Sequence, residues 1–291
     1  MKKQLILVLF CSGLMMNLAA QRIEVKNTQL IKETGTGAYY PKFTPDGKAI
    51  VFTAEGYEGL KTLNLQTKKL KQLTTDAGAG YSFAISDDSK TVCFRKMDYS
   101  SPDGSPSFYS VNLETQKKQH LLTPTTPGMV RPVQLMKAKA AIKSPVVAFI
   151  NEDLQIGLIK NGKTLVLTPN GAEESYLYAA LSPDKKKIAY FVSSKNEAFV
   201  CDLSGKLLAS LGILHAIQWL NNNWVVGMDE KDDGHVVTSS KIVGVTANGK
   251  IRQELTFGEN IAMYPAVSPA GDKIAFNTLD GKLYMMNVIV K

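Results

Sequence analysis

Tyrosines and carboxylates stand together in the loops of this chain, and they are the side chains best suited to meet a binding partner. Tyrosine combines a rigid apolar ring with a polar hydroxyl, a mixture that is enriched in recognition surfaces. Carboxylates beside it would suit a cationic protein, a sugar with many hydroxyls or a calcium ion. Loop composition alone is the competing explanation, because turns favour Asp and other polar residues in any protein.

The sequence shows no arrangement of side chains typical of catalysis or of a metal site. His120, His215 and His235 lack metal-ligand spacing, and the Gly-x-Ser-x-Gly turn that carries hydrolase nucleophiles does not occur. The run 228–235 crowds four carboxylates together, but Lys231 stands in its middle, so we interpret the run as an acidic loop. We therefore expect no catalytic residue, no metal and no cofactor.

Residues 1–20 have the features of a secretory signal. Lys2 and Lys3 precede a short apolar run, and small residues precede a cleavage point after Ala20. We expect one mature domain, residues 21–291, that is periplasmic or secreted and has no transmembrane segment, since no run approaches the roughly 20 apolar residues that a spanning helix needs. Its charge falls from +8 to about +6 when the two lysines are removed, and we do not expect it to bind nucleic acid.

One pattern recurs along the chain: an apolar residue, a Ser/Thr-Pro-Asp-like turn, a lysine, and an apolar pair that ends in an aromatic. Proline presets φ at the first turn position, and alternation on both sides predicts two half-buried strands joined as a hairpin. Clear copies occupy 43–52, 85–94, 181–190 and 267–276, and degenerate copies occupy 146–149 and 219–226.

A second hairpin follows each copy, so that each repeat has four strands. In the six repeats, the first strand of this second hairpin covers residues 63–65, 111–113, 156–158, 200–203, 243–245 and 286–288. Short strands at this period, without helical periodicity, predict an all-β fold, a six-bladed β-propeller of four-stranded antiparallel blades. The last copy ends after its third strand, and a spare outer strand precedes the first copy. We therefore expect residues near 23–33 to complete the last blade and close the ring, which removes an exposed sheet edge.

The run 40–48, Tyr-Pro-Lys-Phe-Thr-Pro-Asp-Gly-Lys, and the run 284–288, Tyr-Met-Met-Asn-Val, resemble the WD-like Pro-Asp repeats of TolB-type propellers. The resemblance covers essentially all of residues 23–290. It implies a TolB-like propeller without the N-terminal α/β domain that TolB carries. Because propellers are scaffolds for many activities, the resemblance is specific for the fold and says less about function.

Related propeller enzymes define the alternatives. Peptidases of the prolyl oligopeptidase type pair such a propeller with an α/β-hydrolase domain, for which no residues remain here. Propeller lyases that degrade oligogalacturonate use a histidine-rich metal centre in the channel. By the phase of the repeat, His120 falls on an outer strand, so at most two histidines face inward. A carbohydrate-active lyase or hydrolase working in the central channel is the alternative function.

The strand phase sorts loop residues onto two faces of the ring. Turns between strands one and two, and between three and four, share a lysine-rich face, which we interpret as a solvated surface. The opposite face collects an acidic collar that includes Glu55, Asp98, Glu173 and Asp229. It also collects eight of the eleven tyrosines: Tyr39, Tyr40, Tyr57, Tyr81, Tyr99, Tyr176, Tyr178 and Tyr264. At its centre, two sets of equivalent residues border the innermost strands and form the predicted binding site: Tyr39, Tyr81, His215 and Met263, and beside them Tyr40, Tyr178 and Tyr264.

The leading hypothesis is therefore an exported, non-catalytic binding or scaffold protein of a bacterial-type cell envelope. It would be a monomer that recognises an envelope protein or a glycan through the acidic, tyrosine-rich face.

Cys93 and Cys201 lie in apolar runs of different repeats, which predicts two buried thiols and no disulfide. Trp219 and Trp224 flank a turn in the fifth repeat, and we expect both in the core.

Overall fold

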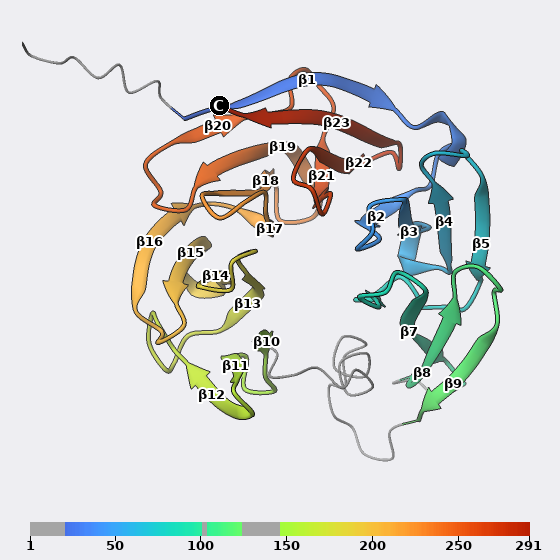
Figure 1. Cartoon of the computed structure of the whole chain (residues 1–291), viewed down its shortest axis with the longest axis horizontal. Coiled ribbons are helices and arrows are strands. Elements are labelled where there is room, and N and C mark those ends of the chain that lie inside the picture. Colours follow the sequence, from blue (N-terminus) through green and yellow to red (C-terminus); the bar gives the residue numbers. More distant parts are fainter. Residues whose placement is uncertain (1–20, 101–103, 124–145) are drawn as a thin grey trace, which may run out of the picture.

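The computed structural model describes residues 21–100, 104–123 and 146–291, and within them the chain forms six antiparallel sheets around a central opening (Figure 1). Five sheets have four strands each. The third sheet along the chain has three strands in the described part, and residues 124–145 precede it. The predicted six-bladed β-propeller is confirmed, and the sheets are numbered below as blades 1 to 6.

The blades are given from the innermost to the outermost strand. Blade 1 consists of β2 (Tyr39–Phe43), β3 (Ala49–Thr53), β4 (Leu60–Asn64) and β5 (Leu70–Thr74). Blade 2 consists of β6 (Ala84–Ile85), β7 (Thr91–Asp98), β8 (Ser105–Asn112) and β9 (Lys118–Leu122). Blade 3 shows β10 (Val147–Ile150), β11 (Ile156–Lys160) and β12 (Lys163–Leu167).

The other three blades complete the ring. Blade 4 consists of β13 (Tyr176–Leu181), β14 (Lys187–Val192), β15 (Glu197–Asp202) and β16 (Leu207–Gly212). Blade 5 consists of β17 (His215–Trp219), β18 (Trp224–Asp232), β19 (Val237–Thr246) and β20 (Arg252–Glu254). Blade 6 consists of β21 (Ala262–Val267), β22 (Lys273–Thr278), β23 (Leu283–Val290) and β1 (Ile23–Leu30). Short 3-10 turns are η1 (Lys32–Thr34), η2 (Glu55–Tyr57) and η3 (Ser193–Lys195).

The turn between the first and second strands is held by the same hydrogen bonds in four blades. In blade 1 the Thr44 hydroxyl donates to Asp46 at 2.6 Å and accepts from the Ala49 N–H at 3.0 Å. A side chain that bonds its own turn in this way substitutes for backbone partners and fixes the hairpin. The matching pairs are Ser86 with Asp88, Ser182 with Asp184, and Ser268 with Asp272, at 2.6, 2.6 and 2.7 Å.

The two ends of the chain close the ring, as the strand phase predicted. β1 pairs antiparallel with β23, from Ile23 opposite Val290 to Leu30 opposite Tyr284. The Gln253 side chain of blade 5 adds a second anchor: it accepts from the Ile23 N–H at 2.9 Å and donates to the Ile23 carbonyl at 2.5 Å. The seam therefore leaves β23 paired on both sides, which protects its edge.

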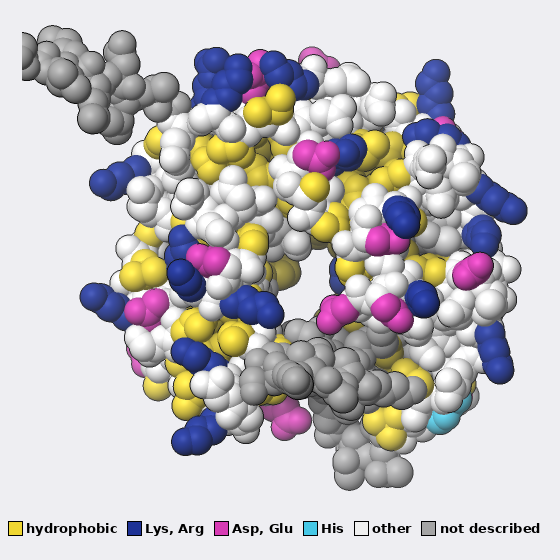
Figure 2. Space-filling view, in the orientation of Figure 1, with side chains coloured by type: hydrophobic (Ala, Val, Ile, Leu, Met, Phe, Trp, Pro, Cys, Tyr) yellow, Lys and Arg dark blue, Asp and Glu magenta, His cyan; other side chains and the backbone are white. Residues whose placement is uncertain are grey.

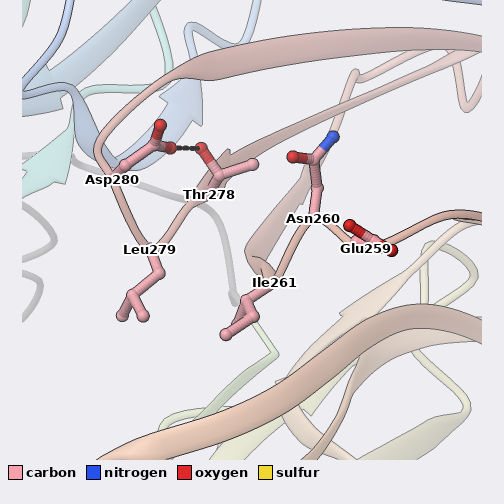
Figure 3. A pocket seen from close by; sticks show the side chains of 6 residues that line it. All are labelled: Glu259, Asn260, Ile261, Thr278, Leu279 and Asp280. Atoms are coloured by element: carbon pink, nitrogen blue, oxygen red, sulfur yellow. Dashed lines mark hydrogen bonds between the residues drawn. The ribbon is translucent and has the colours of Figure 1, made fainter.

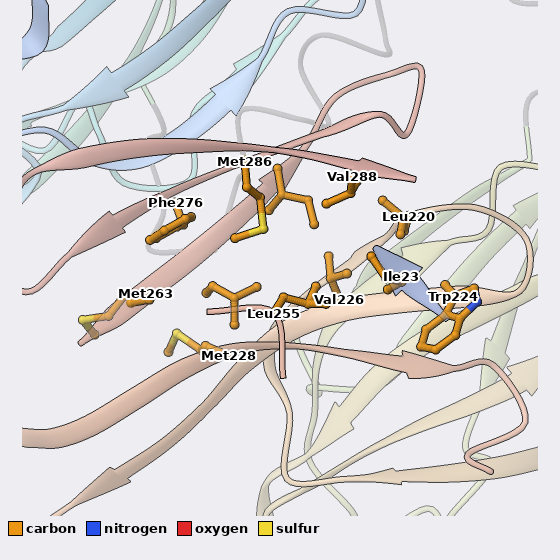
Figure 4. Packing of buried hydrophobic residues seen from close by; sticks show 13 residues of the cluster. Ile23, Leu220, Trp224, Val226, Met228, Leu255, Met263, Phe276, Met286 and Val288 are labelled. Atoms are coloured by element: carbon orange, nitrogen blue, oxygen red, sulfur yellow. The ribbon is translucent and has the colours of Figure 1, made fainter. Parts of the chain in front are cut away.

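Buried apolar side chains lie between neighbouring blades. The cluster between blades 5 and 6 gathers Ile23 from the closing strand with Trp224 and Met286, all nearly inaccessible to water (Figure 4). Gly244 of β19 makes room for this contact, because a Cβ there would lie 2.5 Å from the Cδ1 of Ile23. The first strand of the chain is thus part of the hydrophobic core as well as of the sheet.

Other expectations about single residues agree with the structure. Cys93 in β7 and Cys201 in β15 are buried in different blades, and no disulfide joins these two described residues. Trp224 is fully buried and Trp219 is 8% exposed, as expected for core residues. No helix within the described ranges is long and apolar enough to cross a membrane. In the space-filling view the middle of the ring stays hollow, and many Lys and Arg side chains project from the outer edge of the ring (Figure 2).

Candidate functional site

The innermost strands of blades 1, 4, 5 and 6 carry a β-bulge at the same place. The pairing with the second strand shifts between Tyr39 and Lys42 in blade 1, and at the matching points of blades 4, 5 and 6. The bulge holds a residue at positive φ, which side chains other than glycine adopt rarely and at a cost. These residues are Tyr40, Tyr178, Ala216 and Tyr264, with φ of 52°, 57°, 49° and 51°, and Ser82 at 57° stands just before β6 of blade 2.

The bulges bring tyrosine rings together at the rim of the central opening. Tyr40 stacks on Tyr57 with ring centroids 4.7 Å apart, and its hydroxyl lies 3.0 Å from the Tyr57 hydroxyl. The Tyr264 ring lies 4.1 Å from Tyr40 on the other side, and Tyr81 meets Tyr57 edge-on at 5.4 Å. With Tyr178 these residues form what is called here the tyrosine mouth: Tyr40, Tyr57, Tyr81, Tyr178 and Tyr264.

Electrostatics tie Tyr178 of blade 4 to the rest of the mouth. Desolvation raises its pKa, and the negative charge of Glu230 and the phenols of Tyr57 and Tyr81 raise it further. Desolvation likewise raises the pKa of Tyr264, with Tyr57 and Glu230 among the further causes. Since interactions of this kind fall off with distance, the hydroxyls converge around one centre. With raised pKa values, the phenols of Tyr178 and Tyr264 stay protonated at neutral pH and can donate hydrogen bonds to a ligand.

A histidine and a carboxylate from blade 5 complete the rim. His215 Nδ1 lies 2.8 Å from Glu230 Oε1, and its Nε2 lies 3.2 Å from Asn196 Oδ1. Phe191 packs edge-on against the ring at 4.5 Å, and the side chain of His215 is only 16% exposed. The imidazole is fixed from two sides, and in the described structure an amide oxygen occupies the position at Nε2 where a hydrolase would hold its nucleophile.

The predicted site residues differ in how they are placed. Tyr81 and Tyr178 are exposed, and Tyr39, Tyr40, His215 and Tyr264 are half-buried at the rim. Met263 takes its expected strand position, but its side chain is only 6% exposed and packs in the core between blades 5 and 6. Its side chain is therefore not part of the exposed mouth. Among the other tyrosines of this face, Tyr176 is fully buried and bonded to the Gly171 carbonyl at 2.7 Å.

Sequence reasoning did not select three residues that belong to the site. Tyr57 was assigned to the correct face, but its position in η2 gave no sign that it would stack on Tyr40. Glu230 was assigned to an acidic loop. In the structure β18 continues through Glu230 and places its carboxylate beside His215. Arg95 lies over the Tyr81 ring at 3.9 Å, a cation–π contact between distant parts of one repeat that no local pattern signals.

Several carboxylates of this face are neutralised by neighbouring cations. Asp229 pairs with Arg252 at 2.6 Å, and Asp76 pairs with Lys118 at 2.7 Å. Glu174 and Asp280 also have lysine partners, at 2.9 Å and 2.6 Å. Because each pair cancels its own charge, the collar is less negative than the sequence count suggests. Among the described residues, no group of three or more His, Cys, Asp or Glu side chains is placed to hold a metal ion.

A shallow, open pocket lies on blade 6, between the loop that enters β21 and the turn after β22 (Figure 3). Ile261 and Leu279 supply its apolar wall, and the Thr278 hydroxyl bonds the Asp280 carboxylate at its edge. Asp280 is also paired with Lys282, and Glu259 and Asn260 complete the lining, all from blade 6 or the loop that enters it. The tyrosine mouth, which joins several blades, is the better candidate site.

Comparisons with known proteins bear on the fold. No protein-family model matches the sequence, and neither does any curated protein. Among solved structures, TolB from Acinetobacter baumannii is 20% identical, with a TM-score of 0.55 over 79% of this chain and 57% of that one. The WD40 repeats of RRP9 are 11% identical, with a TM-score of 0.58 over 91% and 100% of the two chains. Oligogalacturonate lyase from Vibrio parahaemolyticus is 12% identical, with a TM-score of 0.46 over 87% and 78%.

The expected resemblance to the TolB propeller is thereby confirmed at the level of the fold. The chain spans a little over half the length of the TolB chain that it matches. At such identities the likeness concerns the architecture alone, because propellers of one shape serve many functions.

Proposed function

We propose that the protein is a non-catalytic binding protein that recognises a protein segment or a glycan through the tyrosine mouth. The observation that carries this proposal is the gathering of five tyrosines from blades 1, 2, 4 and 6 on one rim, where their rings and hydroxyls border the central opening. Rigid aromatic rings give contact area at little entropic cost, and their hydroxyls give direction. The TolB-like fold is compatible with such a role.

Two hairpins that extend beyond the innermost strands favour a partner that lies across the tyrosine mouth. The β7–β8 hairpin of blade 2 stays paired as far as Asp98 opposite Ser105, although β6 pairs β7 no further than Cys93. The β18–β19 hairpin of blade 5 stays paired to Asp232, beyond the last contact of β17 with β18 at Met228. Blades 2 and 5 stand opposite each other in a ring of six, so the hairpins would flank a bound segment from both sides.

Export and domain organisation belong to the same proposal. Residues 1–20 would direct the chain out of the cytoplasm, and residues 21–291 would act as one monomeric propeller in the periplasm or outside the cell. An envelope protein or glycan is then the partner within reach. Asp232 and Asp233, at the tip of the blade 5 hairpin, accept backbone hydrogen bonds but form no ion pair within the described residues, and their charge would favour a partner that is basic at its rim.

A carbohydrate-active lyase or hydrolase is the second candidate, and His215 is the residue that would make it credible. Its contact with Glu230 could hold the imidazole in the orientation of a general base. Its other nitrogen, however, faces Asn196, and among the mouth tyrosines the hydroxyls of Tyr40 and Tyr57 already bond each other. Turnover of an oligosaccharide by the wild type and its loss in His215→Gln would favour this candidate over binding alone.

The test of binding compares two glycine variants that have the same backbone geometry. Tyr178→Gly removes an exposed ring at φ 57°, and Lys185→Gly removes an exposed side chain at the same φ on the opposite face. Glycine is chosen because it adopts positive φ without the penalty of roughly 1–2 kcal/mol that other residues meet there. Both variants should therefore fold as well as the wild type.

Each protein would be immobilised, exposed to envelope extract, and the retained proteins and glycans quantified. We expect a defined set that the wild type and Lys185→Gly retain equally and that Tyr178→Gly loses at least tenfold. Tyr264→Gly should behave like Tyr178→Gly. Equal retention by all variants, or a loss confined to Lys185→Gly, would show that the mouth is not the binding face.

A further inference from the structure

Lys42 lies in the middle of β2, the innermost strand of blade 1, two residues after Tyr40. The sheet register gives the equivalent residue in the other blades, because each of them pairs with the matching residue of the second strand. These equivalent residues are Ala84, Ala180, Gln218 and Ala266. At this level of the described channel wall, one lysine stands among short or neutral side chains.

The ammonium group of Lys42 has little internal compensation. Its Nζ donates one hydrogen bond, of 2.5 Å, to the carbonyl of Phe83, and lies 4.4 Å from the centre of the Phe83 ring. An ammonium carries three donors, so two remain for another acceptor. No Asp or Glu in the described part of the chain forms an ion pair with it.

The position of the Lys42 ammonium group makes its lack of a counter-charge unfavourable. The side chain is exposed, and because β2 is the innermost strand, the water that it meets is the water of the central opening. The surrounding blades exclude bulk solvent, and this desolvation lowers the pKa of Lys42 to about 8. At neutral pH most of the population is still charged. A cation that is separated from bulk solvent and has no counter-charge attracts an anion.

We propose that Lys42 is the cationic centre of an anion-binding site in the central channel, and that the site takes a carboxylate. A single ammonium matches the single charge of a carboxylate, whereas a phosphate dianion would leave uncompensated negative charge in the channel. The alanines at the equivalent positions add no bulky side chain at this level of the channel wall, and the exposed amide of Gln218 offers a further donor from blade 5.

The carboxylate has two sources that share this chemistry. It is either a small organic anion that diffuses into the channel, or an acidic side chain or chain end of the partner that sits on the tyrosine mouth. The second source rests on the proposed function, and the first does not. The two are separated by probes of different size: acetate, and a pentaglutamate peptide.

The experiment follows the lysines of the full chain by NMR after ¹³C-dimethylation, with the Lys42 signal assigned from its absence in Lys42→Gln. Acetate at constant ionic strength should shift this signal saturably and raise the apparent pKa of Lys42 by about one unit, which corresponds to tenfold preferential binding to the charged form. Sodium chloride at the same ionic strength should not. Lys185, exposed on the opposite face, is the internal control.

The outcomes separate cleanly. If acetate shifts Lys42 no more than Lys185, there is no anion site and the proposal is wrong. If pentaglutamate acts at far lower concentration than acetate, and Tyr178→Gly weakens the peptide alone, a partner supplies the carboxylate. If Tyr178→Gly changes neither response, the site serves a small anion. Phosphate shifting Lys42 more strongly than acetate at pH 7 would overturn the assignment to a carboxylate.

Discussion

The rings of Tyr40 and Tyr264 lie 4.1 Å apart, and their contact joins blade 1 to blade 6 at the rim of the central opening. Both residues hold positive φ, in bulges that recur at one position of the innermost strands. The same strained backbone recurs in several blades, next to the surface where the tyrosines gather. Bulges and strained residues of this kind are typical of functional sites, where they set the direction of a side chain. The bulge therefore links the regular fold to the irregular mouth.

The bulge can be tested where its side chain makes no ring contact. Ala216 holds φ 49° in β17, so Ala216→Gly removes the left-handed penalty but adds flexibility to the unfolded chain. These effects nearly cancel, and we expect the free energy of unfolding to stay within about 1 kcal/mol of the wild type. Ala216→Val, a β-branched residue in the same backbone, should lower it by about 2 kcal/mol or more. Urea unfolding of both variants measures the difference, and equal stabilities would contradict a strained bulge.

The seam gives a second prediction, with its control in the same sheet. Ile23 is 1% exposed beside Trp224, so Ile23→Ala should lower the free energy of unfolding by about 2–5 kcal/mol. Ile289 lies in the neighbouring strand and is 47% exposed, so Ile289→Ala should cost less than about 1 kcal/mol. Thermal and urea unfolding compare the two, and similar losses would mean that the seam is not part of the core.

Removing the whole seam should change the state of association. Deletion of residues 21–33 leaves the outer edge of β23 without its partner, because β1 supplies all of the pairing on that side. An exposed strand edge of this length promotes edge-to-edge association. Size-exclusion chromatography with light scattering should show dimers or larger species. A stable monomer with wild-type unfolding behaviour would contradict the role assigned to β1.

The blades and the seam could be predicted from the sequence because each has a local cause. A hydroxyl and a carboxylate close every Thr44-type turn through bonds within five residues, so the pattern repeats wherever the turn does. The bulge leaves no such local pattern, since both Tyr and Ala occupy it. In the sequence, nothing distinguishes Lys42 from the other lysines near Pro-Asp turns. Its isolation appears only when the other blades supply Ala and Gln at the same level.

The mouth was predictable in outline and not in detail for the same reason. Counting strands placed Tyr40, Tyr178 and Tyr264 at equivalent positions, and the register confirms that equivalence. It could not show that Met263 turns into the core while His215, at the equivalent position, pairs with Glu230. Which face a side chain takes there depends on packing against the next blade, and that packing involves residues far away in the sequence.

The Ser/Thr–Asp turns make a prediction about acid. Hydrogen bonds from Ser182 and from the Lys186 N–H, with nearby lysine charge, outweigh a small desolvation and hold the pKa of Asp184 below its ordinary value. The pKa of Asp88 is lowered in the same way, and the hydrogen bond from Ser86 is the largest cause. A carboxyl with a lowered pKa in the folded state contributes stability that is present above its unfolded pKa, near 3.8, and is lost as pH falls through the folded value. Ser182→Ala should cost about 1–2 kcal/mol at pH 7 and markedly less below pH 3, as urea unfolding at both pH values will measure. A cost that does not change with pH would contradict the linkage.

The tyrosine mouth makes the opposite prediction at high pH. Desolvation is the leading cause that raises the pKa of Tyr40, Tyr57, Tyr178 and Tyr264 above the ordinary value of 10. A phenol with a raised pKa in the folded state stays neutral there while the unfolded chain loses its proton, so the folded state is favoured less and less as pH rises above 10. We expect tyrosinate absorbance to develop in two steps, with the mouth residues in the later step together with unfolding. Tyr178→Phe, which keeps the ring, should reduce the amplitude of the later step and soften the loss of stability between pH 10 and 11. Should Tyr178→Phe and the wild type titrate alike apart from one early-ionising group, Tyr178 would be solvated like a surface tyrosine, and its place in the mouth would have to be given up.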